Sequence, residues 1–172
     1  MSGPLLTTAR FELWRPQVGD LGGIFALTDD DETRRYLGSF TRDMGDSFAR
    51  LHRNAGSWAL HGYGVFMVRA KGEADIIATC GVFRSWRGLP RLDDVAEAGW
   101  IVRRDWWGKG VAGEVMTAAF DWFDAAHGSQ RIACMIEDGN AGSERLAARF
   151  GFAEYDRNVG EDGKTVVLYE RH

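Results

Sequence analysis

The run Gly108-Lys109-Gly110-Val111-Ala112-Gly113 holds the residues whose types and spacing most clearly indicate chemistry. Glycine lets a backbone turn tightly and approach another group without a Cβ in the way. The hydrophobic pattern predicts a strand over residues 97–102 and a helix over residues 111–126, so the three glycines lie between them. The N-terminus of a helix carries free N–H groups and a partial positive charge. Loop and helix together therefore predict a site for a phosphate or a pyrophosphate.

The same run spells G-x-G-x-x-G, a pattern of dinucleotide-binding proteins that is weak evidence outside its structural context. Here residues 103–107 separate the preceding strand from the first glycine, and only about one further strand–helix unit and a hairpin follow. A doubly wound nucleotide fold needs several parallel strands after this pattern. The context therefore disfavours NAD as the ligand but leaves it open.

The residues after the loop are predicted to form a helix, a strand and a second helix. Apolar residues recur at helical spacing over residues 111–126, and Gly128 is placed to end that helix. A short apolar strand is expected over residues 131–136, and a second helix over residues 143–150 that ends at Gly151. Because a helix joins strand 97–102 to strand 131–136, the two strands are expected to pair in parallel.

Four motifs follow one another in this half of the chain: Glu97-Ala98-Gly99-Trp100-Ile101-Val102, Trp107-Gly108-Lys109-Gly110-Val111-Ala112, Asn140-Ala141-Gly142-Ser143 and Phe150-Gly151-Phe152. In this order they resemble the motifs of the GNAT acetyltransferase superfamily, and most of all its ribosomal-protein N-terminal (Rim-type) branch. The resemblance is strongest over residues 95–155. It implies a single α/β domain over residues 1–172, with a mixed, mostly antiparallel central sheet, helices on both faces and a splayed parallel strand pair.

The resemblance implies acetyl-CoA as the cosubstrate and no metal. The loop backbone would bind the pyrophosphate, the strand before the loop would bind the pantetheine arm, and Asn140 and Ser143 would reach the arm and the thioester. The expected cofactor-binding residues are Ile101, Val102, Trp107, Gly108, Lys109, Gly110, Val111, Ala112, Gly113, Asn140 and Ser143. Trp107 stands where the wider superfamily has Gln or Arg, a feature that the Rim-type branch shares.

Two residues are candidates for the chemistry of acetyl transfer to an amine. Glu97 is the candidate general base, acting directly or through water. The alternative is that Glu97 is a strand carboxylate that faces solvent or a group that orients the substrate. Many family members protonate the departing thiolate with a tyrosine, but Ala147 occupies that position here. Ser143 is the replacement candidate, and its alternative is a residue that caps the following helix or lies in its first turn.

The N-terminal half is expected to supply the rest of the sheet. The predicted strands cover residues 10–14, 63–69 and 75–83, and the predicted helices cover residues 17–27, 29–37 and 46–58. The third helix carries Phe48, Leu51 and Ala55 along one face. Residues 71–74 join the two longer strands as a hairpin, and strands over residues 152–158 and 164–171 form another.

Other polar residues give weaker indications. The acidic runs 29–32 and 93–94 would either line an opening that attracts cationic amines or serve as helix caps and solvated surface. The four histidines have no metal-ligand spacing. Cys80 and Cys134 are isolated in apolar strands and are expected to be buried thiols.

Composition limits the classes of partner. A hydrophobic fraction of 45% with seven tryptophans excludes a disordered chain. The net charge of −4 argues against nucleic acid, no apolar run reaches the ~18 residues that span a bilayer, and the first residues lack a signal-peptide pattern. A cytoplasmic protein is therefore expected, and a homodimer is a further expectation from its aromatic content and the habit of the family.

These observations predict an acetyl-CoA-dependent N-acetyltransferase that moves an acetyl group directly to a primary amine, on a protein N-terminus or a small molecule. A non-catalytic acyl-CoA-binding or sensing module is the alternative, because it would keep the loop and Asn140 but would not need Glu97. An NAD-binding protein is the third hypothesis.

Overall fold

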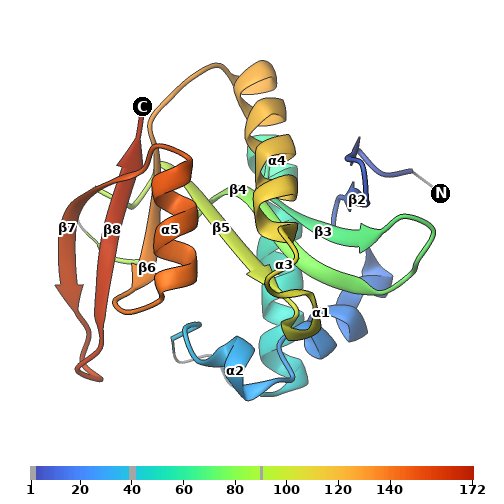
Figure 1. Ribbon diagram of the computed structural model, residues 1–172, viewed down its shortest axis with the longest axis horizontal. Coiled ribbons are helices and arrows are strands. Elements are labelled where there is room, and N and C mark those ends of the chain that lie inside the picture. Colours follow the sequence, from blue (N-terminus) through green and yellow to red (C-terminus); the bar gives the residue numbers. More distant parts are fainter. Residues whose placement is uncertain (1–2, 39–41, 90) are drawn as a thin grey trace.

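The computed structural model describes residues 3–38, 42–89 and 91–172, and in these residues eight strands form one sheet in the order β1-β2-β3-β4-β5-β6-β8-β7 (Figure 1). The strands are β1 Leu6–Thr7, β2 Phe11–Trp14, β3 Val65–Ala70, β4 Ile76–Arg84, β5 Ala96–Val102, β6 Ile132–Glu137, β7 Ala153–Val159 and β8 Thr165–Arg171. The helices are η1 Val18–Asp20, α1 Leu21–Leu27, α2 Asp31–Arg34, α3 Met44–His61, η2 Arg104–Trp106, α4 Val111–His127 and α5 Ala141–Arg149.

Neighbouring strands are antiparallel except for β5 and β6, which run parallel as predicted. Only two residue pairs join them, Ala96 with Ile132 and Glu97 with Ala133. β5 continues to Val102 and β6 to Glu137 without further pairing, so the two strands separate toward their C-terminal ends (Figure 1). The expected fold, a mostly antiparallel sheet with one splayed parallel pair, is confirmed.

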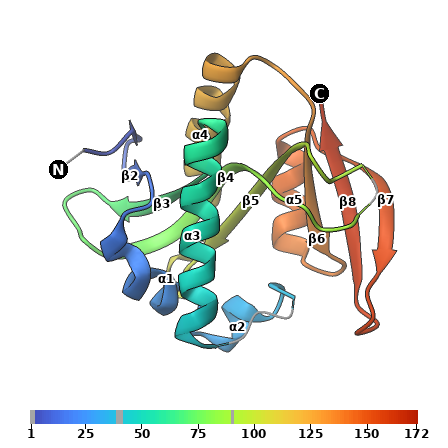
Figure 2. The same cartoon turned by 180° about the vertical axis from the view of Figure 1, so that it is seen from behind.

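Helices cover both faces of the sheet, and the central strands β3 and β4 are buried on both sides along most of their length. α4 and α5 lie on one face (Figure 1), and α1 and α3 lie on the other (Figure 2). Val115, Met116 and Phe123 of α4 pack with strand residues such as Ala96 and Ala98 in the larger buried cluster. On the opposite face, the following residues of α1, α3, β3 and β4 form a second cluster: Ile24, Leu27, Leu51, Val65, Met67 and Ile76.

Helix ends follow from capping residues that are visible in the sequence. Asp43 begins α3 by accepting the N–H of Asp46 at 2.7 Å, and Gly62 ends it in the left-handed conformation at φ +78°. Gly128 ends α4, as predicted. These local signals explain why the predicted elements agree with the observed ones to within a few residues.

Three expectations about the elements are corrected. The helix expected over residues 29–37 is a single turn, Asp31–Arg34, because Asp30 caps it and the chain leaves helical geometry within a few residues. Phe48 is 52% exposed, so unlike Leu51 it is not buried against the rest of the protein. β1 was not expected, because two residues carry no readable alternation.

Cys80 and Cys134 are free and buried, as predicted. Burial raises the pKa of both thiols. Among the described residues no helix is long and apolar enough to cross a membrane.

Candidate active site

The N-terminus of α4 is a cluster of backbone donors that no side chain caps within the described part of the chain. Gly108 and Gly110 have φ values of +70° and +73°, a region that L side chains avoid, so glycine is required to make this turn. Gly110 precedes the helix, and the first helical hydrogen bond is donated by the N–H of Glu114 to the carbonyl oxygen of Gly110. The N–H groups of residues 111–113 therefore have no helical partner and remain available for an anion.

Trp107 holds the loop to the end of β5. Its indole Nε1 donates to the carbonyl oxygen of Val102 at 2.7 Å, and its backbone N–H donates to Arg104 at 3.0 Å. Since this N–H is engaged within the loop, the free donors begin after Trp107. Lys109 places its ammonium 5.2 Å from the ring centroid of Trp106, a cation–π contact on the outer side of the loop.

The gap between β5 and β6 begins directly after Glu97. The N–H of Arg103 donates to Ile77 of β4 at 2.8 Å, and antiparallel strands alternate the direction of their backbone groups. The backbone groups of Val102 therefore point to the side of β6, whereas those of Ile101 point to β4. In this gap the N–H of Val102 is therefore directed toward the side of β6, while its carbonyl oxygen accepts the indole of Trp107.

α5 contributes a polar corner that is tied to β5. Asn140 caps α5, and its side-chain oxygen accepts the N–H of Ser143 at 3.2 Å. The oxygen of Ser143 in turn accepts the indole N–H of Trp100 at 3.2 Å. Ser143 therefore lies in the first turn of α5, while Asn140 is the cap. Ala147 lies one turn farther along and is fully buried.

Glu97 is 2% exposed, which excludes the interpretation that it faces solvent. Its carboxylate accepts hydrogen bonds from the hydroxyl of Ser85 and from Nε of Arg87, the latter at 3.0 and 3.1 Å. Nη2 of Arg87 completes an ion pair at 2.9 Å. Ser85 and Arg87 were not predicted as partners of Glu97, because only the register of β4 with β5 brings the residues after β4 beside it.

Glu97 and Ser143 lie on opposite sides of β5. Side chains alternate along a strand, and Ala96, Ala98 and Trp100 belong to the buried cluster beneath α4 and α5. Glu97 therefore points to the other face, toward the connection after β4. The two predicted catalytic side chains do not contact each other but flank the gap from its two sides.

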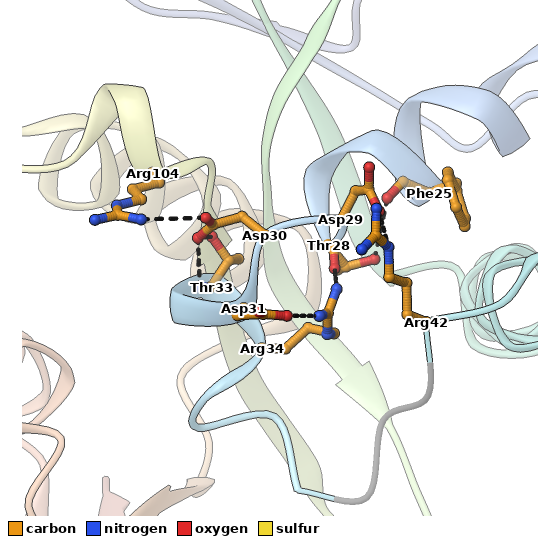
Figure 3. Close-up of polar contacts among 9 residues, drawn as sticks. All are labelled: Phe25, Thr28, Asp29, Asp30, Asp31, Thr33, Arg34, Arg42 and Arg104. Carbon is orange, nitrogen blue, oxygen red and sulfur yellow. Dashed lines mark hydrogen bonds and ion pairs between the residues drawn. The ribbon is translucent and has the colours of Figure 1, made fainter.

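The first acidic run is engaged in ion pairs (Figure 3). Asp30 accepts the N–H of Thr33 at 2.9 Å and pairs with Arg104 at 3.3 Å, and the first of these bonds holds the pKa of Asp30 below its usual value. Asp29 pairs with Arg42, and Asp31 pairs with Arg34. The run caps α2 and ties it to the loop after β5.

The second acidic run is engaged in the same way. Asp93 accepts the N–H of Gly88 at 2.9 Å, and Asp94 pairs with Arg84 at 2.9 Å. These contacts favour a structural role over a funnel for cationic amines. In the described part of the chain no group of three or more His, Cys, Asp or Glu residues could hold a metal ion.

Comparisons with known proteins agree with this geometry. The family model described as an acetyltransferase (GNAT) domain matches residues 10–153. The uncharacterized N-acetyltransferase YoaA of Bacillus subtilis is 26% identical over 158 residues, which cover 87% of this chain and 82% of YoaA.

Two solved structures share the fold. A GnaT-family acetyltransferase from Bordetella pertussis superposes with a TM-score of 0.85 at 28% identity, covering 97% of this chain and 98% of that one. The ribosomal L7/L12 alpha-N-protein acetyltransferase RimL, solved in complex with coenzyme A, has a TM-score of 0.74 at 15% identity, covering 98% and 96%.

Proposed function

The chain belongs to the GNAT acetyltransferase family, and from this premise we propose that it transfers the acetyl group of acetyl-CoA directly to a primary amine. The amine would be a protein N-terminus or a small molecule. The observation that carries the proposal is the gap between β5 and β6, which opens beside the uncapped N-terminus of α4. When bound, acetyl-CoA supplies the acetyl group as a thioester and leaves as a thiolate.

The residues present fit this cosubstrate. The free N–H groups from Gly108 to Gly113 would receive the pyrophosphate, with Lys109 as the nearest loop cation. The N–H of Val102 would donate to a pantetheine carbonyl as a neighbouring strand would, and its orientation favours Val102 over Ile101. The side-chain nitrogen of Asn140 remains free to donate while its oxygen caps α5. RimL, which has the same fold, is a precedent for coenzyme A.

Glu97 would accept the proton of the attacking amine, directly or through a water molecule. Ser85 and Arg87 fix its carboxylate from two directions, so the oxygens are held in one geometry. A positioned base of this kind typically contributes ~10²–10⁴-fold to the rate. The mechanism therefore depends on the burial that keeps Glu97 in place.

Ser143 would act on the departing sulfur. Its oxygen accepts from Trp100, so its own hydrogen remains available to donate. Ala147 has no polar group and is fully buried. Ser143 would therefore be the hydroxyl that takes the place of the tyrosine of other family members.

The test is thiol release from acetyl-CoA in the presence of an amine panel, with coenzyme A binding measured in parallel by calorimetry. The panel pairs peptides that have free N-termini with the same peptides blocked, and adds small mono- and polyamines. Transfer to one class identifies the acceptor. Saturable coenzyme A binding without transfer to any amine would replace the proposal by the non-catalytic acyl-CoA-binding module. A cytoplasmic location and a homodimer stay predictions, which fractionation and light scattering would test.

A further inference from the structure

One face of α3 carries two arginines toward the end of β4. The hydroxyl oxygen of Ser57 on α3 accepts the backbone N–H of Arg84, the last residue of β4, at 3.3 Å. Arg53 lies about one helical turn before Ser57 and Arg50 about two turns before it. Residues at these spacings share one face of a helix. The two arginines are therefore turned toward the connection after β4, which also holds the carboxylate of the candidate base.

The positive charges of three arginines interact at this end of the sheet. The pKa of Arg50 is lowered to about 10, first by burial and then by the charges of Arg53 and Arg87. Asp46 acts in the opposite direction and is the weakest of these effects. Nη2 of Arg87 lies 2.9 Å from the carboxylate of Glu97. The arginines of α3 therefore lie in the field of the same guanidinium that contacts the candidate base.

The carboxylates between β4 and β5 do not compensate Arg53. Asp93 accepts the N–H of Gly88 at 2.9 Å, and Asp94 pairs with Arg84 at 2.9 Å, so both are engaged within the connection. Arg53 is exposed, and in the part of the chain that the structure describes it makes no ion pair and no side-chain hydrogen bond. Since like charges repel, this corner disfavours an acceptor that carries a second positive charge and favours one that carries an anion.

We propose that the acceptor amine carries an anionic group, a carboxylate or a phosphate, which Arg53 and Arg50 bind while Glu97 faces the amine. The inference rests on the proposed function and names a substrate class for it. Guanidinium groups form paired, charge-assisted hydrogen bonds with carboxylates and phosphates. The anion would fix the acceptor at one end, and its nitrogen would attack the thioester and give its proton to Glu97.

The experiment measures acetyl transfer by the wild type, Arg53→Gln and Arg50→Gln to two matched pairs of amines. The pairs are phosphoethanolamine with ethanolamine, and amidated dipeptides whose second residue is aspartate or asparagine. Rates are compared at equal concentrations of the neutral amine. The wild type should prefer the anionic member of at least one pair by about tenfold in kcat/KM (about 1.4 kcal/mol). The pair that shows the preference identifies the source of the anion.

Arg53→Gln should remove most of this preference and change kcat/KM for the neutral amines by less than about twofold. Arg50→Gln should act in the same direction, and its melting temperature is measured because Arg50 is partly buried. Arg145→Gln is the matched control, because it removes an exposed arginine from α5, on the opposite face of the sheet (Figures 1 and 2). It should keep the full preference.

Equal transfer by the wild type to both members of each pair would overturn the inference, and so would a preference that Arg53→Gln and Arg50→Gln both retain. Transfer to any amine tests the proposed function, whereas the ratio within a pair tests the inference, so the two can fail separately. If no amine is acetylated, calorimetry of the two N-acetylated dipeptide amides with the coenzyme A-loaded protein measures the same ratio. Tighter binding of the aspartate form that Arg53→Gln abolishes would support the inference, and equal binding would overturn it.

Discussion

A buried carboxylate that keeps a cationic partner is the central residue-scale feature of this protein. Glu97 is 2% exposed, and removing a buried charge from such a pair leaves the other charge uncompensated. Arg87 is itself partly exposed, with 35% of its side chain accessible, so part of its charge remains solvated. The ion pair therefore holds the Glu97 carboxylate in place at a modest desolvation cost, and this suits a group that must contact a substrate.

Glu97→Gln should lower kcat by about 10²-fold or more, because the amide cannot accept a proton. Gln keeps an oxygen for Ser85 and Arg87, so the fold should remain intact. The affinity for coenzyme A should change less than about twofold, since Glu97 points away from α4 and α5. Steady-state kinetics and calorimetry on the same preparation measure the two effects. An unchanged kcat would show that Glu97 only supports the structure.

Ser143 can be separated from its structural role by a pair of variants. Ser143→Ala and Trp100→Phe both remove the hydrogen bond between these side chains, which is worth about 1 kcal/mol of stability. Only Ser143→Ala also removes the hydroxyl. If that hydroxyl assists the sulfur, Ser143→Ala should slow turnover about tenfold more than Trp100→Phe at similar thermal stability. Equal rates in the two variants would leave Ser143 with the indole contact alone.

At the scale of elements, the chain shows which features sequence can predict. Gly128 ends α4 as predicted, because a helix cap depends on residues close in sequence. Phe48 was expected on one face of α3 with Leu51 and Ala55 but is 52% exposed, because the spacing of apolar residues does not show which neighbours cover them. Ser85 could not be assigned to Glu97, because their contact depends on strand register.

The N-terminal strands are fastened to α4 through Glu114. Its carboxylate accepts the hydroxyl of Thr8 at 2.6 Å, and the N–H and Nε of Arg10 at 3.1 and 2.7 Å. Burial by itself would raise the pKa of Glu114, but the hydrogen bonds from Thr8 and Arg10 outweigh it and hold the pKa below its usual value. The ionised carboxylate therefore stabilises the folded state.

This contact gives a defined dependence of stability on pH. Because the folded-state pKa is lowered, the contribution is complete above the unfolded-state value of about 4.3 and is lost as pH falls through the folded-state pKa. Glu114→Gln should lower the free energy of unfolding by about 1 kcal/mol at pH 7. The difference from the wild type should shrink below pH 4. Urea denaturation at several pH values measures it, and a difference that does not vary with pH would contradict this account.

At the scale of the whole molecule, the sheet consists of two parts joined at one seam. The helix between β5 and β6 predicted their parallel pairing from sequence. The length of that pairing could not be predicted, because Trp100, Ile101 and Val102 are as apolar as any buried strand. Instead of pairing with β6, Val102 accepts a hydrogen bond from Trp107 of the loop, and Trp100 donates one to Ser143 of α5. The candidate site thus lies where β5 and β6, both predicted from the sequence, do not pair.

A ligand that fills the seam should stabilise both parts together. Coenzyme A at a hundredfold excess over its Kd should raise the free energy of unfolding by ~2.7 kcal/mol, whereas NAD should have no effect. If Val102 pairs with the pantetheine arm, amide exchange should slow most at the end of β5 and in the first turn of α4. β2 and β3 should show only the global change. Hydrogen exchange with coenzyme A and NAD side by side measures this. Uniform slowing of amide exchange across the sheet would indicate that coenzyme A binds outside the seam. Slowing by NAD would instead support the hypothesis that the glycine loop binds a dinucleotide.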